Sequence, residues 1–258
     1  MAKDLLWRGM LAGILAALLA TLFARGIAEP QVDRAIAFEE SHEAHGHDHH
    51  HGDESEDAAP VSRDTQKGAG LLTAMTLYGA AVGGMFSLLF AFAYGRLARI
   101  GPRSLAATLA ILAFLVIAVV PALKYPPNPP AVGQAETIQL RTAAYFAMLA
   151  ASLVATALAV RIRAILAARL GAFDATIAAI ASFVVIVAIV QALLPRIDEV
   201  PADFPAQLLW QFRLASLGIQ GLLWATIGLA FGWMADRLIR RRTATASAPR
   251  SPPSTKGR

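Results

Sequence analysis

All six histidines of this 258-residue chain fall within ten consecutive positions, in a segment that is also rich in carboxylates. They are His42, His45, His47, His49, His50 and His51, and the carboxylates among them include Glu43, Asp48 and Asp53. Imidazole nitrogens bind divalent cobalt, nickel, copper and zinc, and neighbouring carboxylates complete the coordination shell or orient the rings. The segment is therefore predicted to capture a divalent transition metal, with binding that weakens below about pH 6 as the imidazoles take up protons. The alternative interpretation is a solvated polar segment without a metal role.

Signatures of catalysis and of permanently bound cofactors are missing from the sequence. It contains no cysteine, which excludes thiolate metal sites, iron–sulfur clusters and a cysteine nucleophile. It also contains no G-x-x-x-x-G-K-[ST] phosphate-binding loop, no H-E-x-x-H metalloprotease motif and no G-x-S-x-G nucleophile motif. We therefore predict that the chain is not an enzyme. Divalent cobalt, nickel or zinc would be a captured or transported ion and not a resident cofactor.

The elements that position the histidine segment are predicted to be membrane helices. Hydrophobic residues make up 56% of the chain and charged residues only 16%, and long apolar runs are almost free of charge. A helix needs about 20 mostly apolar residues to cross a bilayer. Lipid offers no hydrogen bonds to backbone polar groups, so only helices or closed barrels, which satisfy these groups internally, can span it. Runs that meet this requirement predict spans at residues 5–27, 68–95, 104–123, 142–160, 174–195 and 212–235. The expected fold class is all-α, a polytopic membrane helix bundle with about six transmembrane helices.

The segments between the predicted spans differ in charge according to the side on which they would lie. The side that holds both termini carries 15 of the 23 basic residues but only three of the 18 acidic residues. Because basic residues are retained inside the cell, both termini are predicted to be cytoplasmic in a bacterial inner membrane. The outer, periplasmic segments would be the His- and acid-rich loop 28–67, the Pro-rich loop 124–141 and the acidic loop 196–211, and 243–258 would be a disordered cytoplasmic tail.

The basic excess is thus explained by orientation in the lipid bilayer, and no nucleic-acid partner is expected. An alternative for the first helix is a cleaved signal peptide, because a short basic start precedes its apolar stretch. Cleavage would leave the arrangement of the other five predicted helices unchanged.

Few uncharged side chains inside the predicted spans are able to contact a metal ion. Met75, Met148, Gln191 and Gln220 lie at similar depth near the outer ends of their helices, and Glu29 and Asp33 connect the histidine segment to the first helix. One hypothesis is that these residues form part of an ion pathway. The alternative is structural, since methionine fills gaps in cores and glutamine forms hydrogen bonds with neighbouring helices.

Three pairs of glycines are spaced four residues apart within the predicted spans. The pairs are Gly9 and Gly13, Gly79 and Gly83, and Gly228 and Gly232. This spacing lets two helix backbones approach closely. It is compatible with packing inside the chain and also with dimerisation.

Several segments resemble the CbtA family, which comprises predicted cobalt transporter subunits of bacteria. Residues 11–33 resemble the family's first helix and its exit, and the His-rich segment after it is also similar. The most specific match is the Pro-rich stretch PALKYPPNPPAVG at 121–133, and further similarity covers 199–216. The resemblance implies uptake of cobalt for cobalamin synthesis. It also implies a small single-helix partner, similar to CbtB, with a His motif of its own.

The residues and the resemblance together predict a membrane subunit of a divalent transition-metal uptake system, with cobalt as the expected ion. The outer His-rich loop would capture the ion and the helix bundle would pass it inward. The alternative function is a membrane-anchored metal sensor or chaperone that binds nickel, cobalt or zinc without transporting it.

Overall fold

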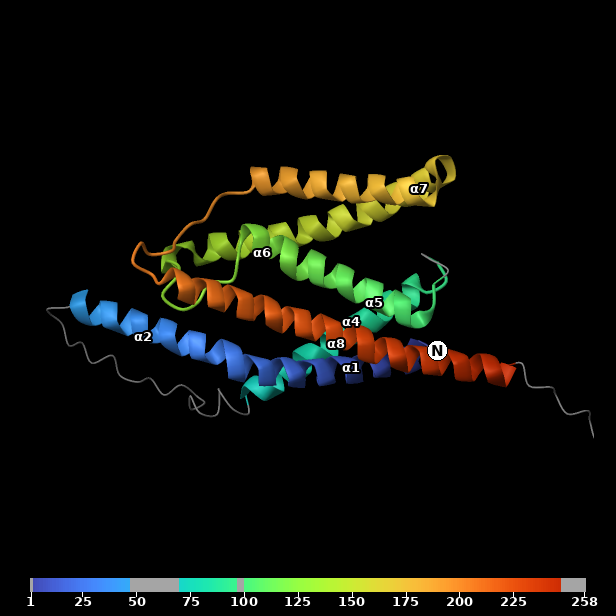
Figure 1. Ribbon diagram of the computed structural model, residues 1–258, viewed down its shortest axis with the longest axis horizontal. Coiled ribbons are helices and arrows are strands. Elements are labelled where there is room, and N and C mark those ends of the chain that lie inside the picture. Colours follow the sequence, from blue (N-terminus) through green and yellow to red (C-terminus); the bar gives the residue numbers. More distant parts are fainter. Residues whose placement is uncertain (1, 47–69, 97–99, 247–258) are drawn as a thin grey trace, which may run out of the picture.

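The computed structural model describes residues 2–46, 70–96 and 100–246, and nearly all of these residues lie in helices (Figure 1). Seven α-helical elements are separated by two π-helical turns and one 3₁₀ turn within this part of the chain. They are α1 (Ala2–Phe23), the π turn η1 (Ala24–Ala28), α2 (Glu29–Gly46), α4 (Leu71–Ala93), α5 (Pro102–Ala113), the π turn η3 (Phe114–Val119), α6 (Val120–Lys124), the 3₁₀ turn η4 (Ala135–Thr137), α7 (Ile138–Leu193) and α8 (Ala206–Ala246). The all-α fold class predicted from the sequence is confirmed.

Five helices within the described residues are long and apolar enough to cross a membrane. They cover Ala2–Ser41, Leu72–Ala93, Pro102–Lys124, Ala135–Leu193 and Ala206–Ala244. The fourth includes α7, which would be about 84 Å long if it were straight, far more than a bilayer requires. It reverses at Gly171, whose φ of 81° and ψ of 168° are accessible to glycine at little cost. Its two arms lie side by side in Figure 1 and correspond to the helices predicted at 142–160 and 174–195, although the second arm ends at Leu193.

The first helix extends much further than the sequence indicated. We expected it to end at residue 27 and a loop to begin at 28, but the chain continues through η1 into α2 and stays helical to Gly46. The physical reason is tertiary packing, because Ala35 is completely buried against Val132, Phe204 and Leu208. The ring of Phe38 also meets that of Phe204 edge to face, with centroids 5.0 Å apart.

Both π-helical turns directly precede a helical proline. η1 ends just before Glu29 and Pro30, and η3 ends just before Val120 and Pro121. Proline lacks a backbone N–H and its ring clashes with the carbonyl four residues earlier, so an ordinary α-helical turn would be broken there. The wider π turn lets each helix continue past its proline. In η3 the carbonyl of Val116 also accepts a 2.8 Å hydrogen bond from the hydroxyl of Ser152, which ties α7 to this turn.

The core of the bundle begins with close packing of α1 on α4 through glycines. A Cβ atom on Gly13 would overlap the Gly79 carbonyl, and one on Gly83 would lie 2.9 Å from the Cα of Gly13. A Cβ atom on Gly9 would likewise overlap the carbonyl oxygen of Gly83. Two of the three glycine pairs therefore pack against each other within one chain. Of the two alternatives left open by the sequence, packing inside the chain and dimerisation, these pairs follow the first.

The third glycine pair makes a similar contact between α8 and α5. A Cβ atom on Gly228 would lie 2.6 Å from the Cβ of Ala110, and one on Gly232 would lie 3.1 Å from the Cβ of Ala106. Because α8 also packs against the aromatic side chains of α4, it joins the two helix pairs. Small residues thus determine which helices are adjacent in this bundle.

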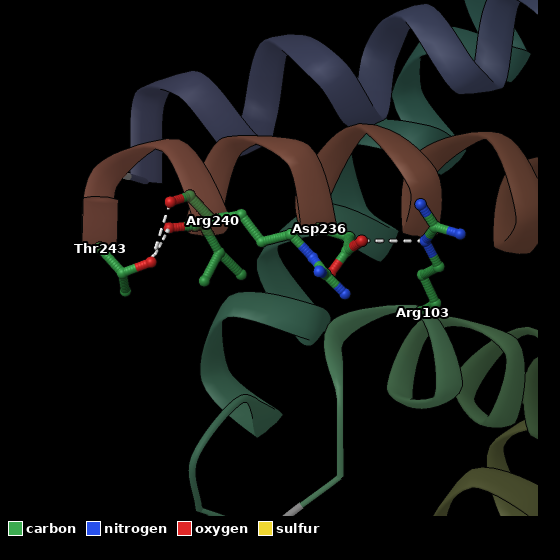
Figure 2. A network of polar contacts seen from close by, with 5 residues as sticks. Arg103, Asp236, Arg240 and Thr243 are labelled. Atoms are coloured by element: carbon green, nitrogen blue, oxygen red, sulfur yellow. Dashed lines mark hydrogen bonds and ion pairs between the residues drawn. The ribbon is translucent and has the colours of Figure 1, made fainter. Parts of the chain in front are cut away.

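The two ends of the bundle differ in the segments they contain. The Pro-rich end holds residues 125–134 and 194–205, and the basic end holds the start of α1, the turn between α4 and α5, the Gly171 bend and the end of α8 (Figure 1). At the basic end the buried carboxylate of Asp236 lies 3.0 Å from the Nε atoms of both Arg103 and Arg240 (Figure 2). Such pairing compensates the cost of burying a charge. It ties the first turn of α5 to α8.

Candidate functional site

A cavity of about 860 Å³ is lined in part by the two segments of the Pro-rich end. Its walls come from α4, η3, α6, the first arm of α7 and α8, and the segments 125–132 and 197–200 also contribute. Most of the lining is apolar, with polar side chains that include Tyr125, Asn128, Arg141, Glu199, Arg213 and Gln220. An apolar cleft with a few convergent polar groups is typical of a binding site for a small ligand.

Hydrogen bonds between segments far apart in the sequence hold the Pro-rich segment in place beside the cavity. The hydroxyl of Tyr125 donates to the carbonyl of Pro195 at 2.8 Å. The Nη2 atom of Arg213 donates to Oδ1 of Asn128 at 2.9 Å. The prolines restrict the backbone of this loop, and the two hydrogen bonds fix its position on the segment after α7 and on α8.

Glu199 makes a second set of contacts across the cavity. Its carboxylate accepts a hydrogen bond of 2.9 Å from the backbone N–H of Gln134 and lies 3.6 Å from Nε of Arg141. A hydrogen bond from the side chain of Thr137, the backbone bond from Gln134 and the charge of Arg141 lower the pKa of Glu199 below its ordinary value of 4.5. The carboxylate is therefore stabilised in its ionised form by the segment that precedes α7.

We expect these contacts to make stability depend on acid pH through Glu199. Since its pKa is lowered in the folded state, the stabilisation is complete above the ordinary value of 4.5 and is lost as the pH falls through the lower folded-state value. Thermal unfolding of the detergent-solubilised protein from pH 7 to pH 3 should show a smaller acid-induced decrease in Glu199→Gln than in the wild type. Substitution of the exposed Glu136 by Gln is the matched control and should follow the wild type. If the unfolding temperatures of all three proteins decrease equally with pH, Glu199 does not contribute to the pH dependence of stability.

The four intramembrane pathway candidates do not come together in this cavity. Gln220 is part of the lining, whereas Met75, Met148 and Gln191 are not. Met148 is fully buried in an apolar cluster with Val120 and Val187. Met75 is half-buried on α4, and Gln191 in the second arm of α7 has a buried amide nitrogen without a hydrogen-bond partner. A pathway through all four residues stays a prediction.

The predicted metal-binding segment lies mostly outside the described residues. His47, His49, His50 and His51 are outside them, as are Asp48 and Asp53. The backbone at His42, Glu43 and His45 belongs to the end of α2, which was expected to be a loop. Glu29 is half-buried and Asp33 is exposed at the start of the same helix. Within the described part of the chain, no group of three or more metal-binding side chains is assembled.

Sequence reasoning missed the two arginines of the cavity. Arg141 directly precedes the predicted span 142–160 and Arg213 is the second residue of the predicted span 212–235, so both belong to the predicted outer side, where acidic residues dominate. The sequence feature that could have identified them is their charge, because they are basic residues on a predicted side whose segments are mainly acidic. Their distance in sequence concealed that they would line one cavity.

Apolar helices able to cross a membrane several times, with a partly polar cavity at one end, define the chain as a multi-pass membrane protein. Comparison with protein families specifies it further, because the family described as "Probable cobalt transporter subunit (CbtA)" matches residues 2–236. The chain belongs to the CbtA family. Comparisons with curated proteins and with solved structures found no match.

Proposed function

We propose that this protein is the membrane subunit of a divalent transition-metal uptake system, with cobalt as the ion and cobalamin synthesis as its use. The observation that carries the proposal is the family match, which extends from the first helix to Asp236 and so includes every wall of the cavity. The family's description as a transporter subunit also supports a role other than catalysis. The word subunit supports a partner, which we propose to be a small single-helix protein with a His motif, similar to CbtB.

The proposed first step is capture of the ion by the histidine segment on the outer side of a bacterial inner membrane. The segment begins at His42, near the end of α2, and α2 packs through Phe38 on Phe204 beside the Pro-rich end. Ions captured at the end of α2 would therefore be held on the side of the bundle where the Pro-rich end lies. Several exchangeable imidazoles favour weak, reversible binding, and surrounding carboxylates raise the local cation concentration.

The proposed second step is passage through the bundle toward the basic end. A dication that enters a cell with a potential of about 100 mV, negative inside, gains roughly 4 to 5 kcal/mol. This energy is available to drive uptake without a nucleotide-binding site in this chain, and a partner subunit would be able to add to it.

The test is uptake of radioactive cobalt by cells that lack other cobalt importers, with and without this protein and its partner. We expect uptake to depend on the protein and to persist in the presence of excess nickel or zinc. Complete competition by nickel would contradict the assignment of cobalt. Absence of uptake with both subunits in the membrane would overturn the transport proposal and favour a metal sensor or chaperone.

A further inference from the structure

An exposed stripe on α8 changes from apolar to basic as the helix approaches the basic end of the bundle. Leu229 is 70% exposed, Trp233 is 44% exposed and Arg237 is exposed as well. These residues are four positions apart, so they lie on one face of the helix, one turn after another. The charge-free part of α8 ends at Ala235. Because tryptophan on a membrane helix prefers the headgroup level, we expect this face to leave the hydrocarbon at Trp233.

The aromatic ring of Trp233 holds a cation at this level. The guanidinium of Arg237 lies over the ring, 3.8 Å from its centroid. Such a contact is attractive and keeps a long side chain in one position. The end of α4 has a similar arrangement, in which the guanidinium of Arg96 lies 5.4 Å from the ring centroid of the exposed Phe92. Two helices that reach the basic end therefore each carry an arginine over an exposed aromatic ring.

The arginines near the end of α8 differ in their partners. Arg240 pairs with Asp236, and Nη2 of Arg242 lies 2.7 Å from the carboxylate of Asp4. For Arg237, none of the carboxylates in the described part of the chain lies within ion-pair distance. Its contact with an uncharged ring does not neutralise the guanidinium. A cation in this position, directly after lipid-facing side chains, is complementary to an anionic lipid headgroup.

We propose that this face of α8 binds an anionic phospholipid. The headgroup phosphate would contact Arg237, and an acyl chain would lie along Leu229, about 12 Å away along the helix axis. The planar guanidinium matches two phosphate oxygens with parallel hydrogen bonds. A zwitterionic lipid fits less well, because its headgroup brings a cation of its own beside the phosphate. The inference does not depend on which ion, if any, the bundle transports.

The test is native mass spectrometry of the full-length protein released from detergent micelles that contain equal amounts of phosphatidylglycerol and phosphatidylcholine with the same acyl chains. The wild type should retain phosphatidylglycerol in preference to phosphatidylcholine. Arg237→Gln should reduce this preference about fivefold, which corresponds to roughly 1 kcal/mol for one basic residue near the membrane surface. Arg237→Lys, which keeps the charge without the planar fork, should retain most of it. Trp233→Leu, which keeps an apolar side chain but removes the ring below the guanidinium, should reduce the preference about twofold.

Arg169→Gln is the matched control, because it removes the same charge from an exposed position near the Gly171 bend, where the residue four positions earlier is Ile165 and not an aromatic. It should keep the wild-type preference. The inference is overturned if the wild type shows no preference, or if Arg169→Gln and Arg237→Gln reduce it equally. Displacement of the lipid by an equal concentration of soluble glycerol phosphate would show a phosphate site and overturn the assignment to lipid. A dimer in the spectra without excess phosphatidylglycerol would show that a second copy covers this face, which also overturns the inference.

Discussion

Gly13→Ala should destabilise the protein by about 3 kcal/mol, the upper part of the usual range for an overpacked core. The added Cβ atom would lie 2.7 Å from the carbonyl carbon of Gly79 and 3.0 Å from the Cα of Gly83. Both obstacles are backbone atoms of α4, so no side-chain rotation relieves the clash. The two helices must separate along their contact, which exposes the apolar core behind them.

The measurement is unfolding of the detergent-solubilised protein, followed by tryptophan fluorescence during heating and by size-exclusion chromatography. Gly26→Ala is the matched control, because its Cβ atom would meet nothing within 4 Å although the residue belongs to the same continuous helix. Replacing a helical glycine by alanine normally stabilises by about 0.5 to 1 kcal/mol. The two substitutions should therefore have opposite signs. Equal stability of both variants would show that the close contact between α1 and α4 is not formed.

Replacement of all six histidines by asparagine should reduce cobalt uptake at low metal concentration by about tenfold or more, because tethered ligands raise the effective concentration of the ion. Uptake at saturating cobalt should remain close to the wild-type rate, since the helix bundle is unchanged. The wild type should also lose uptake below about pH 6, where imidazole is protonated, and the variant should not. Initial rates of cobalt uptake over a range of concentrations and pH values measure both effects.

A double variant, Glu54→Gln with Glu56→Gln, separates coordination from electrostatic attraction in the same segment. It removes charge and keeps every imidazole, so its smaller effect should vanish at high ionic strength. Immunoblots of membrane fractions control for expression. If the histidine variant reduces uptake equally at all cobalt concentrations, the segment acts in the translocation step and not as a collector. If the histidine variant has the same uptake curve as the wild type, the histidines have no role in uptake.

Membrane helices and the separation of charge could be predicted from the residues because the bilayer imposes these features locally. About 20 apolar residues must occur consecutively, as they do in 104–123, whatever the neighbouring helices are. The reversal at 161–173 could also be expected, since Arg161, Arg163 and Arg169 interrupt the apolar run. The bend itself occurs at Gly171, the residue type that tolerates its positive φ.

The continuation of the first helix to Gly46 could not be predicted in this way. Residues 29–46 contain many charged and polar side chains, and nothing in their hydropathy indicates a buried face. Their helix is stabilised by Ala35 and Phe38 against Phe204 and Leu208, about 170 residues away in the sequence. Most helical stability in proteins comes from such tertiary packing and not from local propensity.

The glycine pairs and the cavity also combine features that the sequence predicts with features that depend on tertiary packing. The spacing of Gly9 and Gly13 predicted a close helix contact but not its partner. In the folded chain the partner is α4, whose Gly79 and Gly83 lack side chains and let the two backbones approach. Residue types alone predict a metal-binding segment, since coordination chemistry depends on the kind and number of ligands nearby. Arg141 of α7 and Arg213 of α8 line one cavity because packing brings segments that are distant in the sequence together.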